Sequence, residues 1–518
     1  MKRALVVALI SLTLTATAHA EPDAAGLFAS HCAACHGTDR LGGRGPALLP
    51  ESLGRLTGSA LTAVIAAGRP GTGMTGFADQ LAPEALAALG RWLQTTSPAI
   101  PDWGLQQMLD SRQILRSPAS LPDRPVHTAD PLNLFVVVET GDSHITILDG
   151  DRFEPLARLP SHFALHGGPK FAPDGRFVYL ASRDGWISKV DLHALATVAE
   201  IRVGFNTRNL AISSDGKVLA VGNLLPQTLV LLDAADLTPL KVIAVADRSG
   251  KTPSRISAVY QAAPRNSFVV ALKDVAELWE VSWLEQPPPV HPGLVHSYEK
   301  GMEEKLPLST GRFPIRRIEL KQPLDDFFFD PGYHHLVGSA RGGGAVVVNL
   351  EVGAEIATLS LPGLPHLGSG ITWSVGDRPV MASPNLREGV VSIIDIKSWV
   401  VTNRIDTLGP GFFLRSHENT PYAWADCSMS PARDTLQILD KQTLTVVRTL
   451  RPEPGKTASH VEFSRDGRFA LVSIAEPEGW LVVYDAATFE EVKRLPMRKP
   501  SGKYNVFNKI TLSSGTSH

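Results

Sequence analysis

The chain has few of the features that mark several large classes of protein. Only three cysteines occur in 518 residues, so a disulfide-stapled scaffold is excluded. Lys and Arg number 50 against 52 Asp and Glu, and the net charge of −2 leaves no basic excess to hold a nucleic-acid backbone. Beyond the N-terminus, no stretch reaches the roughly 18 uninterrupted apolar residues that a membrane span requires. Hydrophobic residues make up 43% of the chain, which predicts a folded protein of several domains without a nucleic-acid partner.

The first twenty residues have the form of a secretory signal peptide. Lys2 and Arg3 precede an apolar run, which ends at the small-x-small cleavage pattern Ala18-His19-Ala20. We therefore expect an exported protein whose mature chain begins near Glu21. A retained N-terminal anchor is the alternative.

The segment Cys32-Ala33-Ala34-Cys35-His36 has the C-x-x-C-H pattern of covalent c-type haem attachment. The two thiols of Cys32 and Cys35 would bind the haem vinyl groups, and His36 would ligate the iron. Met74, 38 residues after His36 in a glycine-rich loop, would present its thioether to the other face of the iron. The alternatives are a disulfide or redox dithiol for the cysteines, and a core position for Met74 with another axial ligand. The isolated Cys427 is most simply a buried core thiol.

The residues around this motif have helical patterns. A helix-like stretch at 24–31 precedes it, and 83–94 reads as an amphipathic helix with Leu86, Leu89, Trp92 and Leu93 facing inward. Residues 21–97 are therefore predicted to form a small all-α class I cytochrome c domain. It would carry one covalent haem c, with His36 and Met74 as the iron ligands.

After a Pro- and Ser-rich linker at 98–125, short β-branched runs recur at regular spacing. Seven of these runs end in Asp or Asn, at intervals of 42, 42, 116, 46, 45 and 45 residues. The long interval holds one more unit, at 277–283, and an insertion at 285–313. The seven runs end at Asp149, Asp191, Asp233, Asn349, Asp395, Asp440 and Asp485.

Eight units at this spacing predict an all-β, eight-bladed β-propeller over residues 126–518. Asp-Gly turns between apolar runs, as at Asp174-Gly175, are typical of the hairpins within each blade. Each blade can bury its faces only against its neighbours, and eight blades leave a central channel wide enough for a large planar ligand. A tandem of two-sheet sandwiches is the alternative.

A c-type cytochrome followed by an eight-bladed propeller resembles the cytochrome cd1 family, whose propeller holds haem d1. The resemblance covers essentially the whole mature chain. The segments that carry it are Leu165-His166-Gly167-Gly168, Thr207-Arg208-Asn209, residues 365–370, residues 411–417 and residues 501–508.

The resemblance implies roles for individual residues. His166 matches the proximal iron ligand of haem d1, and Arg208 matches an arginine that meets the carboxylates of the macrocycle. Nitrite reductases of the family place two histidines on the distal face, of which His417 matches one and Asn385 stands at the other. Because an amide cannot supply the proton that nitrite reduction needs, Asn385 argues against that activity.

The insertion at 285–313 is also foreign to the reductases and resembles the haem d1 biogenesis branch of the family. The type in this branch that carries haem c converts a propionate of dihydro-haem d1 to the acrylate of haem d1. The resemblance therefore implies a periplasmic oxidoreductase, with dihydro-haem d1 or haem d1 bound non-covalently as substrate or product. It further implies a soluble electron acceptor and transient complexes with cytochrome cd1 nitrite reductase and other biogenesis proteins.

Removing two hydrogens from adjacent carbons requires a base. We expect His417, His366 and His460 to be the candidates for this base and for a distal ligand, because each lies at or near the start of an inner strand of the propeller or in its following turn. Tyr504 stands where the resemblance has a phenylalanine in reductase-like tails, and a phenol there can hydrogen-bond the reacting side chain. The alternatives are structural hydrogen bonds for the histidines, core packing for Tyr504, a strand-capping role for His166 and a surface salt bridge for Arg208. Arg255 is a weaker second carboxylate clamp.

Two other functions compete with the dehydrogenase hypothesis. The architecture alone is compatible with an NO-forming cytochrome cd1 nitrite reductase. A non-catalytic carrier that delivers haem d1 to the reductase is the third hypothesis.

Overall fold

The computed structural model describes residues 21–53, 56–69, 74–95, 102–291, 308–340, 343–512 and 514–516. The predicted signal peptide (1–20), the glycines at 71 and 73 and most of the 285–313 insertion lie outside these ranges. Within them, no helix combines the length and the apolar character needed to cross a bilayer.

The N-terminal part of the chain is helical and has its own core. Pro83 stands at the first position of its last helix, where a missing N–H costs nothing. The apolar side chains of three helices meet in a core of Phe28, Leu61, Ile65, Leu86, Leu89 and Leu93. Trp92 is partly buried beside this core, and the guanidinium of Arg40 lies 4.6 Å from the centre of its ring. The helices are α1 (Ala24–His31), α2 (Ala33–His36), α3 (Pro50–Leu53), α4 (Gly58–Ala67) and α5 (Pro83–Leu93).

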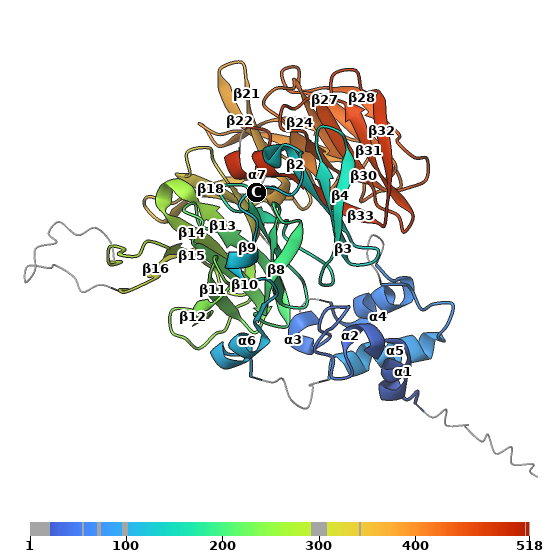
Figure 1. Ribbon diagram of the computed structural model, residues 1–518, viewed down its shortest axis with the longest axis vertical. Helices are drawn as coiled ribbons and strands as arrows, with labels where there is room; N and C mark the ends of the chain where they lie inside the picture. Colours follow the sequence, from blue (N-terminus) through green and yellow to red (C-terminus); the bar gives the residue numbers. More distant parts are fainter. Residues whose placement is uncertain are drawn as a thin grey trace, which may run out of the picture.

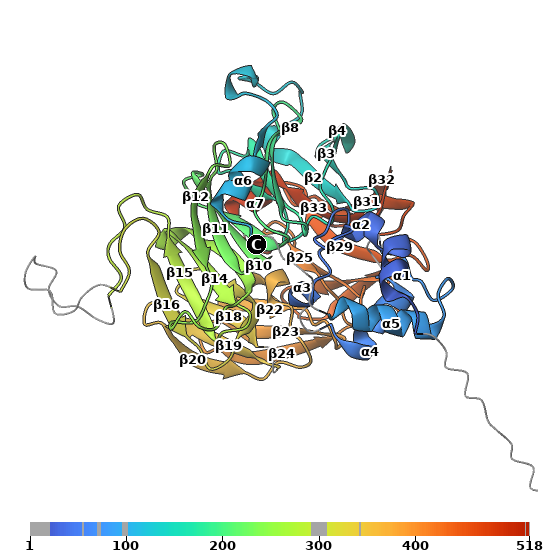
Figure 2. The same cartoon turned by 90° about the horizontal axis from the view of Figure 1, so that it is seen from below.

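The rest of the chain forms eight antiparallel sheets arranged as a ring, which confirms the predicted eight-bladed propeller (Figures 1 and 2). In each blade the strand named first below is innermost, and blade 2 carries β1 as a fifth, outer strand. Blade 1 consists of β33 (Pro500–Asn505), β2 (Leu134–Glu139), β3 (His144–Asp149) and β4 (Glu154–Pro160), and blade 2 of β5 (Lys170–Phe171), β6 (Phe177–Ala181), β7 (Trp186–Asp191), β8 (Ala196–Arg202) and β1 (Gln113–Ile114). Blade 3 consists of β9 (Asn206–Ile212), β10 (Val218–Leu225), β11 (Thr228–Asp233) and β12 (Pro239–Ala244), and blade 4 of β13 (Ile256–Ala262), β14 (Ser267–Leu272), β15 (Glu277–Ser282) and β16 (Ile315–Glu319). Blade 5 consists of β17 (Leu324–Phe329), β18 (His335–Ala340), β19 (Ala345–Asn349) and β20 (Ala354–Leu359), and blade 6 of β21 (Ile371–Val375), β22 (Arg378–Ser383), β23 (Val390–Asp395) and β24 (Val400–Asp406). Blade 7 consists of β25 (Leu414–Ser416), β26 (Tyr422–Asp426), β27 (Leu436–Asp440) and β28 (Val446–Leu450), and blade 8 of β29 (Ala458–Phe463), β30 (Phe469–Ile474), β31 (Gly479–Asp485) and β32 (Glu491–Met497).

The two ends of the propeller sequence meet in one blade. The last strand, β33, pairs antiparallel with β2, so that Lys503 lies opposite Val137. This pairing supplies the inner strand of blade 1 from the C-terminal end of the chain and so closes the ring. The helix α7 (Val506–Thr511) follows β33 directly.

The Asp or Asn residue that ends seven of the predicted repeats lies at or near the end of the third strand of a blade. Asp149 ends β3, and its carboxylate accepts hydrogen bonds from the backbone N–H groups of Asp151 and Arg152. Asp395 and Asp440 cap the turns after β23 and β27 in the same way. The repeat therefore reflects a recurring Asx-type turn between the third and fourth strands.

The segment predicted as a linker holds α6 (Leu105–Ser111), β1 and the short 3₁₀ helix η1 (Pro118–Ser120), and it packs on blades 2 and 3. Three more 3₁₀ helices occur in the propeller, η2 (Pro131–Asn133), η3 (Ala263–Arg265) and η4 (Leu367–Ser369). The α1–α5 helices lie against one end of the ring (Figures 1 and 2).

The contact between the two parts is apolar and is supported by one arginine. Ala47 and Leu49 of the helical part pack with Phe205 and Leu225 of blade 3. Arg202, at the end of β8, lies over the rings of Trp103 and Phe205 and donates a hydrogen bond to the carbonyl of Leu41.

Candidate functional site

The C-x-x-C-H segment lies at the junction of α1 and α2. Cys32 and Cys35 are not joined in a disulfide. His36 is buried, and its Nδ1 lies 2.8 Å from the carbonyl oxygen of Pro46. Because that oxygen can only accept, Nδ1 carries the proton and Nε2 keeps the lone pair that an iron ligand needs.

The surroundings of His36 suit a haem ligand in two further ways. Burial lowers the pKa of His36, which keeps the imidazole neutral. A Cβ on Gly45 would lie 2.6 Å from the Cε1 atom of the ring, so only glycine allows this close packing. The donor set of two free thiols and one oriented imidazole therefore fits a covalent haem c.

Met74 is half-buried in the loop after α4, and its carbonyl accepts a hydrogen bond from the backbone N–H of Arg69. Its role as the second iron ligand stays a prediction. Cys427 is fully buried in the propeller, and burial raises the pKa of its thiol, in keeping with a core position.

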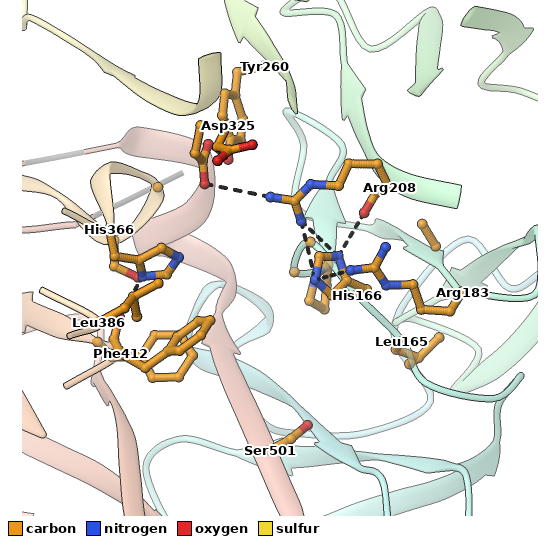
Figure 3. Close-up of a pocket in the computed structure, with 18 of the residues that line it drawn as sticks. Leu165, His166, Arg183, Arg208, Tyr260, Asp325, His366, Leu386, Phe412 and Ser501 are labelled. Carbon is orange, nitrogen blue, oxygen red and sulfur yellow. Dashed lines mark hydrogen bonds and ion pairs between the residues drawn. The ribbon is translucent and has the colours of Figure 1, made fainter. Parts of the chain in front are cut away.

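A second candidate site is a cavity of about 510 Å³ in the channel of the propeller (Figure 3). Its wall comes from the inner strands, from the loops that precede them, and from the ends of the second strands with the turns that follow them. This size lies within the range of sites that hold one organic ligand. The lining includes His166, Arg183, Arg208, Tyr260, Asp326, His366, Phe412, Phe413, Arg415 and Tyr504.

His166 lies in the wall of the cavity, just before the inner strand of blade 2. Its Nδ1 lies 2.7 Å from the carbonyl oxygen of Arg208, so Nδ1 is the protonated nitrogen. Arg183 donates to Nε2 at 2.9 Å, so Nε2 is the nitrogen that carries the lone pair. Burial, followed by the charges of Arg183 and Arg208, lowers the pKa of His166 and keeps it neutral. His166 can therefore offer Nε2 to a metal centre.

His366 faces His166 from the other side of the cavity (Figure 3). It stands before the inner strand of blade 6, and blades 2 and 6 are diametrically opposite in a ring of eight. Its Nδ1 lies 2.7 Å from the carbonyl oxygen of Phe412, so Nε2 is again the lone-pair nitrogen. Two oriented imidazoles on opposite walls fit the two faces of a planar metallocycle.

Arginines give one side of the cavity a positive charge. Arg208 lies 3.7 Å from Asp326, and Asp326 accepts a hydrogen bond from the hydroxyl of Tyr260. Among the residues that the structure describes, no carboxylate pairs with Arg183, and burial together with the cations of Arg208 and Arg69 lowers its pKa to about 9. This part of the cavity therefore favours a ligand that carries carboxylates.

Tyr504 and His460 lie together near another part of the wall. Their rings are 5.0 Å apart, and His460 also packs 4.5 Å from the ring of Phe413. Tyr504 and Phe413 line the cavity, and His460 stands directly behind them. Neither ring nitrogen of His460 has a hydrogen-bond partner from another residue in the described part of the chain.

Besides His460, two of the residues predicted for this site lie outside the cavity wall. His417 follows β25 at the opposite end of the inner strand, where its Nε2 lies 3.1 Å from the carbonyl oxygen of Arg465. The side chain of Asn385 is bonded to the backbone of its own loop, at Arg387 and Glu388, and to the backbone of the loop before η4, at Pro362 and Leu364. Asn385 therefore joins the two loops that carry the lining residues Leu364 and Leu386, and its amide does not face the cavity.

Sequence reasoning missed Arg183 and Arg415. Arg183 directly precedes the Asp184-Gly185 turn of the blade that holds His166, so the turn signal could have located it. Arg415 lies two residues before His417 on the inner strand β25, nearer the cavity end of that strand. Arg255, considered as a second clamp, pairs with Asp274 at 2.6 Å on blade 4.

Two family models match the chain. The model described as "Cytochrome D1 heme domain" matches residues 129–509. The model described as "Cytochrome C oxidase, cbb3-type, subunit III" matches residues 19–93. The two matches correspond to the propeller and the helical part.

Curated relatives match over most of their own length. The chain is 52% identical over 513 residues to "Dihydro-heme d1 dehydrogenase" of Pseudomonas aeruginosa, covering 98% of this chain and 99% of the relative. It is 27% identical over 384 residues to "Protein NirF" of the same organism, covering 71% and 90%. It is 25% identical over 536 residues to "Nitrite reductase" of Stutzerimonas stutzeri, covering 93% and 92%.

A solved structure titled "Dihydro-heme d1 dehydrogenase NirN in complex with DHE" superposes with a TM-score of 0.80. The sequences are 53% identical, and the match covers 94% of this chain and 99% of that chain.

Proposed function

Since the chain belongs to the family of the cytochrome D1 haem domain, we propose that it dehydrogenates dihydro-haem d1, converting a propionate side chain of this substrate to the acrylate of haem d1. The observation that carries the proposal is the 52% identity to a dihydro-haem d1 dehydrogenase along both the helical part and the propeller. The nitrite reductase relative is also a full-length match, but at 25% identity.

In this proposal the two opposed histidines hold the metal of the substrate. His166 is the proximal ligand, and Arg183 gives up its bond to Nε2 when iron binds there. His366 approaches the opposite face through its own Nε2. Both imidazoles are fixed by a backbone carbonyl, so they are oriented before the substrate enters.

Arg208 and Arg183 bind substrate carboxylates. The guanidinium of Arg208 is held by the carbonyl of Ser257 and faces Asp326 at 3.7 Å, which fixes its direction. A guanidinium held in one direction can form two parallel hydrogen bonds with a carboxylate. This pairing sets the rotation of the macrocycle in the cavity.

The reaction removes two hydrogens from adjacent carbons and releases two protons and two electrons. Burial raises the pKa of Tyr504 to about 12, so its phenol is a proton donor at neutral pH and can hydrogen-bond the reacting side chain. Burial lowers the pKa of His460, so its neutral imidazole can accept a proton beside Tyr504. His366 is the alternative base, and a role for His417 would have to operate from outside the cavity wall.

Haem c, when bound at Cys32, Cys35 and His36, accepts electrons one at a time. The haem c site lies close to the cavity. Leu224 lines the cavity, and the next residue, Leu225, packs on Ala47 and Leu49 of the helical part. Pro46, next to Ala47, holds the imidazole of His36.

We also propose a location and partners. The signal-peptide form of residues 1–20 supports a location in the periplasm. There it would pass electrons to a soluble acceptor and make transient contacts with cytochrome cd1 nitrite reductase, which uses the product, and with other biogenesis proteins.

The test is to incubate the purified protein anaerobically with dihydro-haem d1 and an excess of a one-electron acceptor. We expect conversion to haem d1, seen in the absorption spectrum and in the mass of the extracted tetrapyrrole, with two acceptor molecules reduced per product. Binding without conversion would contradict the proposal and favour a carrier. Rapid release of nitric oxide from nitrite would favour a reductase.

A further inference from the structure

His460 occupies an irregular position in the inner strand of blade 8. The register of β29 against β30 shifts between Ser459 and Val461, which makes His460 the extra residue of a β-bulge. Its φ of +48° lies in the left-handed region, which a residue with a side chain rarely adopts. A bulge redirects a side chain, and a strained residue persists only where neighbouring contacts hold it.

The redirected imidazole is completely buried and has unused hydrogen-bonding capacity. It packs against Phe413 and Tyr504, which line the cavity. Neither of its ring nitrogens has a partner from another residue in the described ranges. A buried imidazole without hydrogen-bond partners lowers the stability of the fold unless a ligand or substrate supplies a partner.

The contact that holds the bulge comes from Lys503. This lysine lies on the ring-closing strand β33, next to Tyr504, and is completely buried. Its Nζ donates to the backbone carbonyl of His460 and, at 2.8 Å, to the hydroxyl of Ser473. A buried amine in an inner strand is expensive, and packing alone would be served by an apolar residue.

Several charged groups surround the bulge and act on the imidazole. Burial, followed by the cations of Lys503, Arg415 and Lys509, lowers the pKa of His460. The titratable and charged groups that face it are Lys503 and Tyr504 of β33, Arg415 of β25, Lys509 of α7 and Glu462 of its own strand, which pairs with Lys509 at 3.3 Å.

We infer that Lys503 is the positioning residue of the site: by holding the carbonyl of the His460 bulge, it directs the imidazole toward Tyr504 and the reacting side chain. The inference rests on the proposed dehydrogenase function. Lys503 acts through His460 and does not itself touch the substrate.

The first test compares Lys503→Met with Ser473→Ala. The methionine keeps the unbranched shape and most of the length of the side chain and removes its donors. We expect kcat to fall about 10²-fold, the effect of displacing a reacting group by about 1 Å, with KM changed less than about threefold. The acid limb of the kcat profile should move to higher pH, because a nearby cation is lost. Ser473→Ala keeps the bond to the His460 carbonyl, and its kcat should stay within about twofold of wild type.

An unchanged kcat and pH profile in Lys503→Met would overturn the inference, as would an equal loss of kcat in Ser473→Ala. If Lys503→Met lacks a cooperative unfolding transition, Lys503→Gln takes its place, since its amide retains a donor. Lys503→Gln should show a smaller fall in kcat with KM preserved and, because its amide carries no charge, an acid limb at higher pH; an acid limb at the wild-type pH would overturn the inference.

A second measurement does not depend on turnover. The ¹H–¹³C resonance of the His460 ring, assigned by its loss in His460→Gln and recorded with haem c reduced, should titrate at higher pH in Lys503→Met than in wild type. An identical midpoint would overturn the inference. If wild type fails to dehydrogenate the substrate, the proposed function falls, and this titration still decides whether Lys503 controls His460.

Discussion

Replacing Tyr504 by Phe removes one hydroxyl from the cavity wall and should leave the ring in place. A Cβ on Gly168 would lie 3.0 Å from Cε1 of this ring, and a Cβ on Gly502 would lie 2.8 Å from the hydroxyl oxygen. The ring is therefore closely confined. Because its pKa of about 12 keeps the phenol protonated, the variant loses a hydrogen-bond donor to the reacting side chain. A hydrogen bond to a group that develops charge contributes about 2–3 kcal/mol, so kcat should fall about 30- to 160-fold.

The assay is steady-state oxidation of dihydro-haem d1 with a one-electron acceptor, together with a spectroscopic titration of substrate binding. We expect an unchanged affinity and a uniform loss of kcat between about pH 6 and pH 9, because a phenol with so high a pKa does not titrate there. Tyr179→Phe is the matched control: it removes a buried hydroxyl that bonds the carbonyl of Ala234, and it should lower stability without lowering kcat. Wild-type kcat in Tyr504→Phe would refute the reasoning.

Three further predictions concern binding, electron exit and stability. Arg208→Met should weaken substrate binding about 10- to 150-fold in a spectroscopic titration, from the loss of about 1.5–3 kcal/mol of charge-assisted bonding. Arg255→Met, whose guanidinium pairs with Asp274, should not weaken binding, and equal effects would contradict the assignment. Arg202→Ala should loosen the contact between the helical part and the propeller by about 1–2 kcal/mol, through lost cation–π and hydrogen-bond contacts. Stopped-flow reduction of haem c by bound substrate should then slow while the haem c spectrum stays unchanged, and an unchanged rate would count against this contact as the route. Because the folded state lowers the pKa of His166 and His460, the unfolded chain binds more protons below about pH 6.5, and the free energy of unfolding should fall as pH drops from about 7 to 5. Denaturant unfolding at a series of pH values measures this, and a constant or rising stability would contradict it.

The repeat could be predicted from the sequence because one local interaction recurs in it. The acidic residue that ends the third strand caps the next turn through its own carboxylate, so the signal needs no long-range contact. The C-x-x-C-H motif could be recognised for the same reason, because its five residues are consecutive in the sequence. The strand β1 could not be predicted, because its two residues form a strand only by pairing with β8, which lies more than eighty residues later in the chain.

The cavity was harder to predict because it assembles single residues from several blades. Direction along the inner strands decides which residues reach it: His366 precedes β21 and faces the cavity, whereas His417 follows β25 and lies at the other end of the channel. Composition and spacing do not show on which end of a blade a histidine lies. Lys503 was missed because its partner is a backbone carbonyl, which leaves no trace in the side-chain pattern.

Dihydro-haem d1 with deuterium on both methylene carbons of the propionate shows whether a side chain of the bound tetrapyrrole is what reacts, when the product is followed by mass spectrometry under single-turnover conditions. We expect a product that has lost one deuterium from each carbon, with a slowed rate relative to unlabelled substrate and with electrons appearing on haem c. A bound tetrapyrrole that keeps all of its deuterium while haem c becomes reduced would contradict this expectation.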